Sequence, residues 1–203
     1  MKQGTEQIRK ANIKTLAKIG VLAALAGVIM LLEFPFPFAP TFYKFDFSEI
    51  PVLVGAFALG PIAGMIIELI KMLLNFVLNG TVTAGVGEVS NFFIGCALVM
   101  PAAIIYKKHK TFKGAIIGLV TGILTLTIVG AILNYAVLLP VYSRVYGAPL
   151  QSFVDMGHAI NKYIVDLKTL VLYAVVPFNL LKGIIVSTIT LLIYKKISPI
   201  LHK

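Results

Sequence analysis

The sequence contains few of the residues on which soluble enzymes and disulfide-stabilised domains depend. Only 13% of its 203 residues are charged, Trp is absent and Cys96 is the single cysteine. Soluble domains carry roughly 25% charged residues, so this composition is not that of a soluble domain. A single cysteine excludes an intramolecular disulfide framework and a cysteine metal site. The chain also has no G-x-x-x-x-G-K-[S/T] segment, so it lacks a phosphate-binding loop for using ATP itself.

Residues typical of catalytic centres are also scarce. His109 and His202 lie in basic segments and His158 stands alone, so none has the spacing of metal ligands. There is no Ser/His pair in a suitable local motif and no carboxylate-rich metal signature. We therefore expect no enzymatic activity, no bound metal and no cofactor.

Apolar residues are what the chain has in abundance. They make up 59% of the sequence, and the mean hydropathy is +0.95. A formal net charge of +10 would suggest nucleic-acid binding in a soluble protein, but here the basic residues form short clusters between apolar runs. We interpret the chain as an all-α integral membrane protein, a single domain over residues 1–203 surrounded by membrane lipid, with no nucleic-acid partner.

Six apolar segments are candidates for membrane helices. They lie near 14–33, 49–59, 62–78, 90–106, 114–139 and 169–194. A helix needs about 20 mainly apolar residues to span a bilayer, so the second is too short to cross alone. Gly60-Pro61 separates it from the third, and we expect these two to form a broken or strongly tilted pair. The first segment resembles a signal peptide, but further spans follow, and we interpret it as a retained helix.

The distribution of Lys and Arg predicts the topology, because cytoplasmic loops near spans are enriched in them. With both termini inside, twelve of these residues fall in cytoplasmic segments and four in outer ones. We therefore expect a multi-pass protein of the cell (plasma) membrane with both termini cytoplasmic. The outside receives three irregular stretches: one with prolines at 35, 37 and 40, one after the third helix, and the segment from Pro140 to Lys168. These long outer loops would roof a central cavity.

Lys182, in the segment PFNLLKGIIV, lies near the middle of the last predicted span. A lysine at that depth costs roughly 2.5 to 3.5 kcal/mol on insertion scales. Asn179 is three residues earlier and on the same helical face. In one interpretation Lys182 bonds a carboxylate or carbonyls of a neighbouring helix and only fixes packing. In the other, Lys182 and Asn179 are an inward-facing donor pair at the floor of a pocket for a polar ligand.

Other polar residues in apolar surroundings also have two interpretations. The Asn134 amide either forms a hydrogen bond between helices or lines a pocket. At the start of the fourth helix, Ser90 or Asn91 is either an N-cap, with Glu88 favouring the helix dipole, or part of a donor-rich surface for an uncharged polar ligand.

Further polar and charged residues stand in the first outer loop, at the end of the first helix and within the third helix. Tyr43, Lys44 and Asp46 are either solvated loop residues or reach over a cavity. Glu33 is expected at the membrane interface. Glu68 and Lys71, three residues apart, are expected to neutralise each other.

Small residues recur at four-residue spacing on the first helix. Gly20 and Ala24 form one such pair, and Ala23 and Gly27 form another. This spacing lets another helix approach closely, so we expect the first helix to face protein rather than lipid.

Four motifs in order resemble a known family. They are YKFDFSEIPVLVGAFALGPIAGMIIELIKMLLNF, GVGEVSNFFIG, LNYAVLLPVY and VPFNLLKG. They are similar to the riboflavin-specific substrate-binding subunit (S component) of energy-coupling factor (ECF) transporters, from about Lys14 to Lys196. The resemblance implies six helices and capture of riboflavin, as transported substrate, from outside. It also implies delivery through an energising module of a transmembrane coupling subunit and two cytoplasmic ATPases.

The same resemblance implies roles for individual residues. The flavin ring would be bound by Asn179, Lys182 and Asn134, and loop positions extend the ligand set to Tyr43, Lys44, Glu88 and Asn91. Docking to the coupling subunit uses an AxxxA motif, which falls on Gly20 and Ala24 with a glycine replacing the first alanine. Asn offers acceptor and donors and Lys donors only, which suits the imide edge of a flavin. The ring would be walled by aromatic residues: Phe34, Phe36, Phe38, Phe42, Tyr43, Phe45 and Tyr135.

A second function remains open on the residues alone. The chain would then be a self-sufficient secondary transporter of a small polar-aromatic solute, coupled to protons or sodium through Glu68 and Lys71. Uptake by this chain alone, abolished when the ion gradient is dissipated, would distinguish that function from the first.

Overall fold

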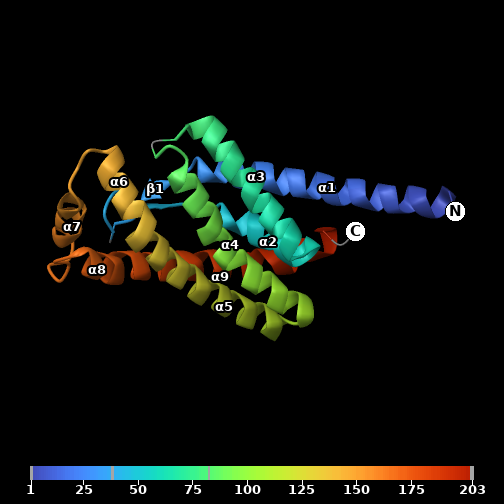
Figure 1. The fold of residues 1–203 in the computed structure, drawn as a ribbon. Helices are drawn as coiled ribbons and strands as arrows, with labels where there is room; N and C mark the ends of the chain where they lie inside the picture. The colour runs from blue at the N-terminus through green and yellow to red at the C-terminus, as the bar shows by residue number, and fades with distance from the viewer. Residues whose placement is uncertain (1, 38, 82, 202–203) are drawn as a thin grey trace.

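The structure is a computed structural model that describes residues 2–37, 39–81 and 83–201, with side chains over 12–37, 39–81, 83–194 and 196. It is mostly helical, as predicted (Figure 1). The long helices are α1 (Lys2–Met30), α3 (Pro61–Asn79), α4 (Val86–Lys108), α5 (Phe112–Leu133) and α9 (Val176–Leu201). The shorter elements are β1 (Phe34–Pro35), β2 (Lys44–Phe45), α2 (Glu49–Leu59), η1 (Asn134–Leu138), α6 (Leu139–Val145), α7 (Leu150–His158), α8 (Leu167–Leu170) and η2 (Val171–Val175).

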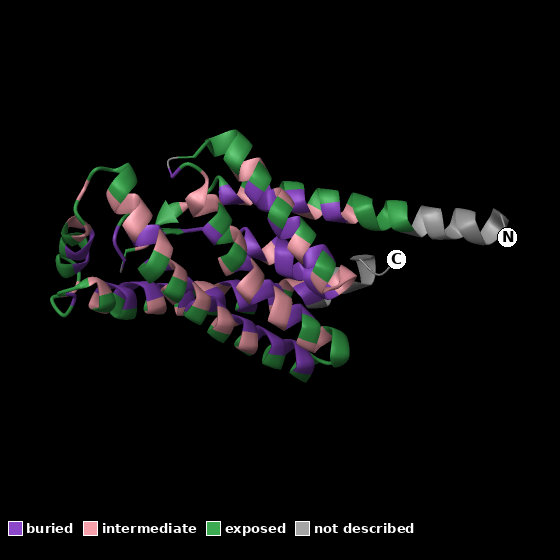
Figure 2. Ribbon diagram, in the orientation of Figure 1, coloured by how far each residue is buried: buried purple, intermediate pink, exposed green. Residues whose placement is uncertain are grey.

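Among the described residues, five helical segments are long and apolar enough to cross a membrane. They run over Asn12–Met30, Pro61–Asn79, Val86–Lys108, Phe112–Val145 and Leu167–Tyr194. Exposed residues recur along these helices (Figure 2). They include the large apolar residues Val21, Val77 and Leu192, each with more than half of its surface accessible. Exposed apolar side chains on long helices are typical of contact with lipid or another protein.

Helix α2 is too short to span a bilayer and lies inside the bundle instead. It packs against α1, α3, α4 and α9, and eight of its eleven residues are buried. The chain reverses at Gly60, whose φ of 104° is a left-handed value that favours glycine, and Pro61 opens α3. The return is close, because a Cβ on Gly64 would lie 2.5 Å from that of Ala56. The break thus occurs where Gly60-Pro61 predicted it.

In the part of the chain that the structure describes, two helices contain a wider π-helical turn, and in each the turn precedes a proline. The Leu139 N–H bonds to Asn134 O, and the Val176 N–H bonds to Val171 O, five residues back in both cases. Pro140 and Pro177 follow one residue later. A proline in an α-helix lacks its N–H and clashes with the carbonyl four residues back. The wider turn loosens this spacing, so the helix continues through the proline.

This continuation corrects the prediction of an irregular stretch from Pro140 to Lys168. The fifth helix runs on through η1 and α6 to Val145 instead of ending near residue 139, and α7 follows after a short turn. In contrast, the first predicted loop has no helix in its described residues, 31–37 and 39–48. There β1 and β2 pair antiparallel, with Phe34 opposite Phe45.

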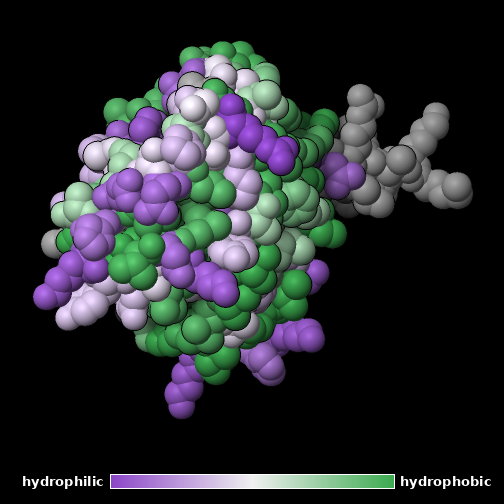
Figure 3. All heavy atoms as spheres, turned by 60° about the vertical axis from the view of Figure 1, so that its left-hand side comes forward, coloured by the Kyte–Doolittle hydropathy of each residue, from purple (hydrophilic) through white to green (hydrophobic). Residues whose placement is uncertain are grey.

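The two ends of the helix bundle contain different segments of the chain. The start of α1, the end of α9 and the turn between α4 and α5 lie together at one end (Figure 1). The loop with β1 and β2, the α3–α4 loop and α7 lie at the other (Figure 1). Seen from that side, hydrophilic side chains gather on the loop end between apolar ones (Figure 3).

Candidate ligand-binding site

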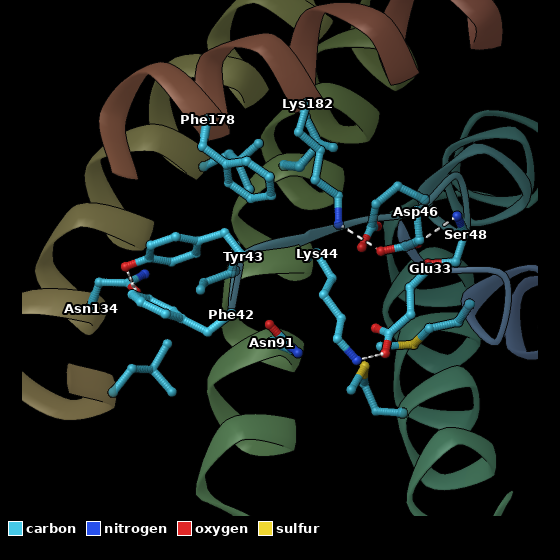
Figure 4. Close-up of a pocket in the computed structure, with 18 of the residues that line it drawn as sticks. Glu33, Phe42, Tyr43, Lys44, Asp46, Ser48, Asn91, Asn134, Phe178 and Lys182 are labelled. Carbon is cyan, nitrogen blue, oxygen red and sulfur yellow. Dashed lines mark hydrogen bonds and ion pairs between the residues drawn. The ribbon is translucent and has the colours of Figure 1, made fainter. Parts of the chain in front are cut away.

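A cavity of about 290 Å³ lies among the segment 30–49, α3, α4, α5, η1, α6 and α9 (Figure 4). This volume is at the lower end of the roughly 300 to 1,000 Å³ usual for small-molecule sites. Its lining combines aromatic rings with charged and amide side chains. The aromatic lining residues are Phe42, Tyr43, Tyr142, Tyr146 and Phe178. The charged and amide lining residues are Glu33, Lys44, Asp46, Glu49, Lys71, Asn91, Asn134 and Lys182.

The segment before α2 brings several of these side chains to the cavity. Phe45 is buried, with its ring centroid 5.4 Å from that of Phe34 and 6.0 Å from that of Phe36. Its neighbours Lys44 and Asp46 line the cavity instead. Successive side chains of an extended chain point to opposite sides, so the packing of Phe45 directs its neighbours toward the cavity.

Lys182 is paired with Asp46. The Lys182 Nζ donates to Asp46 Oδ2 at 2.8 Å, although the two residues are 136 positions apart. Burial alone would raise the pKa of Asp46, but the charges of Lys182 and Lys71 hold that pKa below its usual value. Lys182 thus bonds a carboxylate and also lines the cavity, so its role as a ligand contact stays a prediction. The partner comes from a loop rather than from a neighbouring helix.

Asn134 and Tyr43 join the first loop to η1. The Tyr43 hydroxyl donates to Asn134 Oδ1 at 2.9 Å, and Asn134 Nδ2 donates to Gly130 O at 2.8 Å. Both residues are buried and line the cavity. Burial raises the pKa of the Tyr43 hydroxyl above its usual value, so the hydroxyl stays protonated and serves as a donor. The amide keeps one further N–H and a second acceptor position for a ligand.

Asn179 does not line the cavity. Its Nδ2 donates to Val175 O at 3.1 Å, and a Cβ on Gly130 would lie 2.6 Å from that nitrogen. The side chain is thus packed between α9 and α5. Its neighbour Phe178 lines the cavity in its place, so the structure separates the two members of the predicted donor pair.

Helix α4 begins earlier than predicted, which changes the positions of Glu88 and Asn91. The helix starts at Val86 rather than near residue 90, with Gly85 as N-cap. The Thr83 hydroxyl accepts the Gly87 N–H at 2.8 Å. It therefore bonds a free N–H of the first helical turn, the capping role expected of Ser90 or Asn91. Asn91 lies beyond the first turn and lines the cavity.

Glu88 lies outside the cavity, in contrast to Asn91. Its Oε2 accepts from the Thr81 hydroxyl at 3.0 Å in the α3–α4 loop.

Lys44 forms an ion pair with Glu33, and both line the cavity. The Lys44 side chain is half exposed and that of Glu33 about a quarter. Glu33, expected at the membrane interface, therefore also contributes to the cavity.

The predicted pair of Glu68 and Lys71 is a group of three. Lys71 Nζ lies 2.7 Å from Glu49 Oε1 on α2 and 2.7 Å from Glu68 Oε1. The contact with Glu49 is a hydrogen bond. The contact with Glu68 is an ion pair without hydrogen-bond geometry, so both Glu68 oxygens lack a hydrogen-bond partner among the described residues. All three side chains are at least 90% buried. The prediction that Glu68 and Lys71 neutralise each other omitted Glu49. Two carboxyl groups therefore contact the single Lys71 ammonium group.

The aromatic lining differs from the predicted wall. Phe42 and Tyr43 line the cavity, whereas Phe34, Phe36, Phe45 and Tyr135 do not; Phe38 lies outside the described residues. Phe178, Tyr142 and Tyr146 line it in addition. Two of these stand in motifs already singled out, Tyr142 in LNYAVLLPVY and Phe178 in VPFNLLKG, but an aromatic residue in an apolar helix carries no signal that separates cavity from core or lipid.

The small residues of α1 lie on two different faces. Ala23 and Gly27 are buried, and a Cβ on Gly27 would lie 3.0 Å from Leu74 Cδ1 of α3. Gly20 and Ala24 are exposed, and a Cβ on Gly20 would meet nothing within 4 Å. One face is thus used for packing within this chain, and the other is open.

Long apolar helices around a polar and aromatic cavity are the features of a multi-pass membrane protein with room for a small molecule within its bundle. Residues 14–194 match the family model described as "ECF transporter, substrate-specific component". The chain therefore belongs to the substrate-specific (S) components of ECF transporters, as the four motifs predicted. Membership in a transporter family confirms the prediction of a transport rather than a catalytic role.

Named relatives match over nearly the whole chain. It is 36% identical over 189 residues to "Riboflavin transporter FmnP" of Bacillus subtilis, covering 93% of this chain and 94% of that one. It is 34% identical over 200 residues to "Riboflavin transporter RibU" of Staphylococcus aureus, covering 98% of each. A solved structure titled "Structure and mechanism of the S component of a bacterial ECF transporter" superimposes with a TM-score of 0.73 at 34% identity, covering 95% of this chain and 99% of that one.

Proposed function

We propose that this chain binds riboflavin and is the substrate-binding subunit of an ECF-type vitamin uptake transporter. The observation that carries the proposal is the match, over more than 90% of each chain, to two proteins named riboflavin transporters. The cavity supports it, because its lining suits a flat heteroaromatic ligand with polar edges.

The chemistry of the cavity fits a neutral flavin. Phe42, Tyr43 and Phe178 offer apolar faces for the ring system, and aromatic rings favour offset or edge contacts with one another. Lys182 supplies N–H donors, and Asn134 and Asn91 supply both donors and acceptors. Pockets of this kind are generally apolar with a few placed polar groups.

Asn179 and Glu88 belong to the proposed ligand set on the family resemblance alone, because neither lines the cavity. For Asn179, contact with the ligand requires its amide to give up the bond to Val175 O and turn toward Lys182. Lys44 and Tyr43 stay in the set with the support of their place in the cavity lining.

The proposal includes a topology and a set of partners. Both termini lie in the cytoplasm, the loop end faces outward and the membrane is the plasma membrane. Support comes from the basic segments at the start of α1 and around the α4–α5 turn, which lie together at the end opposite the loops (Figure 1). A coupling subunit and two cytoplasmic ATPases energise the cycle, with Gly20 and Ala24 on the docking face of α1.

Purification of the full chain in detergent tests the proposal. We expect a yellow protein whose visible spectrum is that of retained flavin, or a colourless one that binds added riboflavin in equilibrium dialysis. A colourless protein that does not take up riboflavin would contradict it. In vesicles, this chain alone should show no uptake driven by a proton or sodium gradient; gradient-driven uptake would support the alternative of a self-sufficient transporter.

A further inference from the structure

Three lysines line the cavity among the residues with described side chains. Each is paired with a carboxylate, but they differ in how far they remain accessible. The pairs are Lys44 with Glu33, Lys71 with Glu49, and Lys182 with Asp46. The Lys71 side chain is 2% exposed and that of Lys44 51%, while that of Lys182 is 18% exposed. Lys182 is thus intermediate: it is more accessible than Lys71 and more buried than Lys44.

Asp46 is fixed on both of its oxygens. Oδ2 accepts from Lys182 Nζ at 2.8 Å and Oδ1 accepts the Ser48 N–H at 2.8 Å (Figure 4). The residue is 5% exposed, and it lies between the buried Phe45 and the first turn of α2. A carboxylate only accepts hydrogen bonds, so it cannot bond directly to the carbonyl groups of a ligand. Asp46 therefore acts on such a group through the N–H donors of Lys182.

The pairing leaves Lys182 with capacity for a ligand. An ammonium group has three N–H donors, and Asp46 accepts from one of them. Removal of the carboxylate would leave a desolvated cation without its partner. It would also free a long side chain whose rotamers are otherwise restricted by the ion pair.

We infer that Asp46 is a positioning residue for ligand binding, which holds the Lys182 ammonium so that its remaining N–H groups meet the carbonyl-bearing edge of a neutral heteroaromatic ligand. The inference rests on the proposed function, because it takes Lys182 as a contact of riboflavin. It also predicts that removal of the Asp46 carboxylate weakens ligand binding. If Asp46 instead competed with the ligand for Lys182, its removal would strengthen binding.

A double-mutant cycle tests this inference. Riboflavin affinity is measured by quenching of flavin fluorescence for the wild type, Asp46→Asn, Lys182→Met and the double variant. We expect Asp46→Asn to weaken binding at least tenfold and the double variant to match Lys182→Met within about twofold, since residues that act through one another are not additive. Unchanged or tighter binding by Asp46→Asn, or losses that multiply in the double variant, would overturn the inference.

The position of the visible absorption band of bound riboflavin is a second measurement, because hydrogen bonds to the ring shift the band. A loss of fold lowers the amount of bound riboflavin but does not shift the band of the riboflavin that stays bound. Asp46→Asn and Lys182→Met should share one band position, displaced from that of the wild type. A wild-type band in Asp46→Asn would count against positioning. Asp155→Asn is the matched control, an exposed aspartate of α7 away from the cavity lining, and should bind like the wild type.

Two further outcomes distinguish a failure of the proposed riboflavin binding from a failure of the role of Asp46. If the wild type binds no riboflavin, the proposed function fails and the inference falls with it; if the wild type binds and Asp46→Asn binds equally, only the inference fails. Should Asp46→Asn not fold, Asp46→Glu retains the charge and displaces it by one methylene. It should fold and bind several-fold more weakly, and either wild-type affinity or loss of fold in this variant as well would overturn the role.

Discussion

At the scale of single residues, Gly95 on α4 shows how closely the buried charges are packed. A Cβ at this position would overlap the Glu68 carboxylate and lie 3.2 Å from Glu49 Oε1. The carboxylates cannot easily give way, because both are held against Lys71. We expect Gly95→Ala to destabilise the protein by about 1 to 3 kcal/mol, the usual range for overpacking a core, measured as a lower thermal unfolding temperature in detergent.

Gly20→Ala is the matched control for Gly95→Ala. It is also a helical glycine, but its added Cβ would meet nothing within 4 Å. Alanine is favoured over glycine in a helix interior by roughly 0.5 to 1 kcal/mol, so this variant should be as stable as the wild type or slightly more so. Equal stability of both variants would show that the space beside Gly95 is not needed.

The sequence identified which single residues are out of place in hydrocarbon, but not their partners. Lys182 was recognisable because a lysine at that depth has to be neutralised. Asp46 was not, because it stands in a loop with several polar neighbours and is 136 positions away. The displacement of Asn179 from the cavity depends on a local bond to Val175 O, a choice that asparagine side chains can make in any helix.

At the scale of elements, the three charges of Glu49, Lys71 and Glu68 join α2 to α3. We expect Lys71→Met to destabilise the bundle by about 3 to 5 kcal/mol, because it leaves two buried carboxylates without a cation. Glu68→Gln should have a much smaller effect, since the Glu68 oxygens have no hydrogen-bond partner among the described residues and the hydrogen bond between Lys71 and Glu49 stays. Thermal unfolding of both variants in the same detergent compares them, and a larger loss in Glu68→Gln would contradict this assignment.

Element boundaries were predictable where backbone chemistry alone sets them. Gly60-Pro61 marked the end of α2 and the start of α3 because glycine accepts the left-handed φ and proline suits the first helical turn. Pro140 was a misleading signal, because the π-helical turn from Asn134 to Leu138 carries the helix through it. Both wide turns precede a proline, but a proline alone does not distinguish a helix that continues through such a turn from a helix that ends.

At the scale of the whole molecule, the two faces of α1 predict a separation between binding and transport. Gly20 and Ala24 are exposed and lie away from the cavity lining. Gly20→Leu or Ala24→Leu should therefore keep riboflavin affinity and impair uptake in cells that contain the energising module, because a bulky side chain blocks close approach of another helix.

Val21→Leu is the control for these two variants, because it enlarges an apolar side chain that is already exposed on the same helix. It should support normal uptake. Normal uptake by Gly20→Leu and Ala24→Leu as well would remove the docking role from this face of α1.

The binding account as a whole depends on Lys182 being held for a ligand rather than for packing. The most direct measurement is a fluorescence titration of the purified wild type and Lys182→Met with riboflavin, side by side. We expect saturable binding by the wild type and at least tenfold weaker binding by Lys182→Met. The variant should still insert in the membrane, because Met avoids the cost of a lysine at that depth. Its thermal stability should be lower, because the buried Asp46 loses its partner. Equal affinity in the two proteins would contradict the assignment and leave Lys182 as a packing residue.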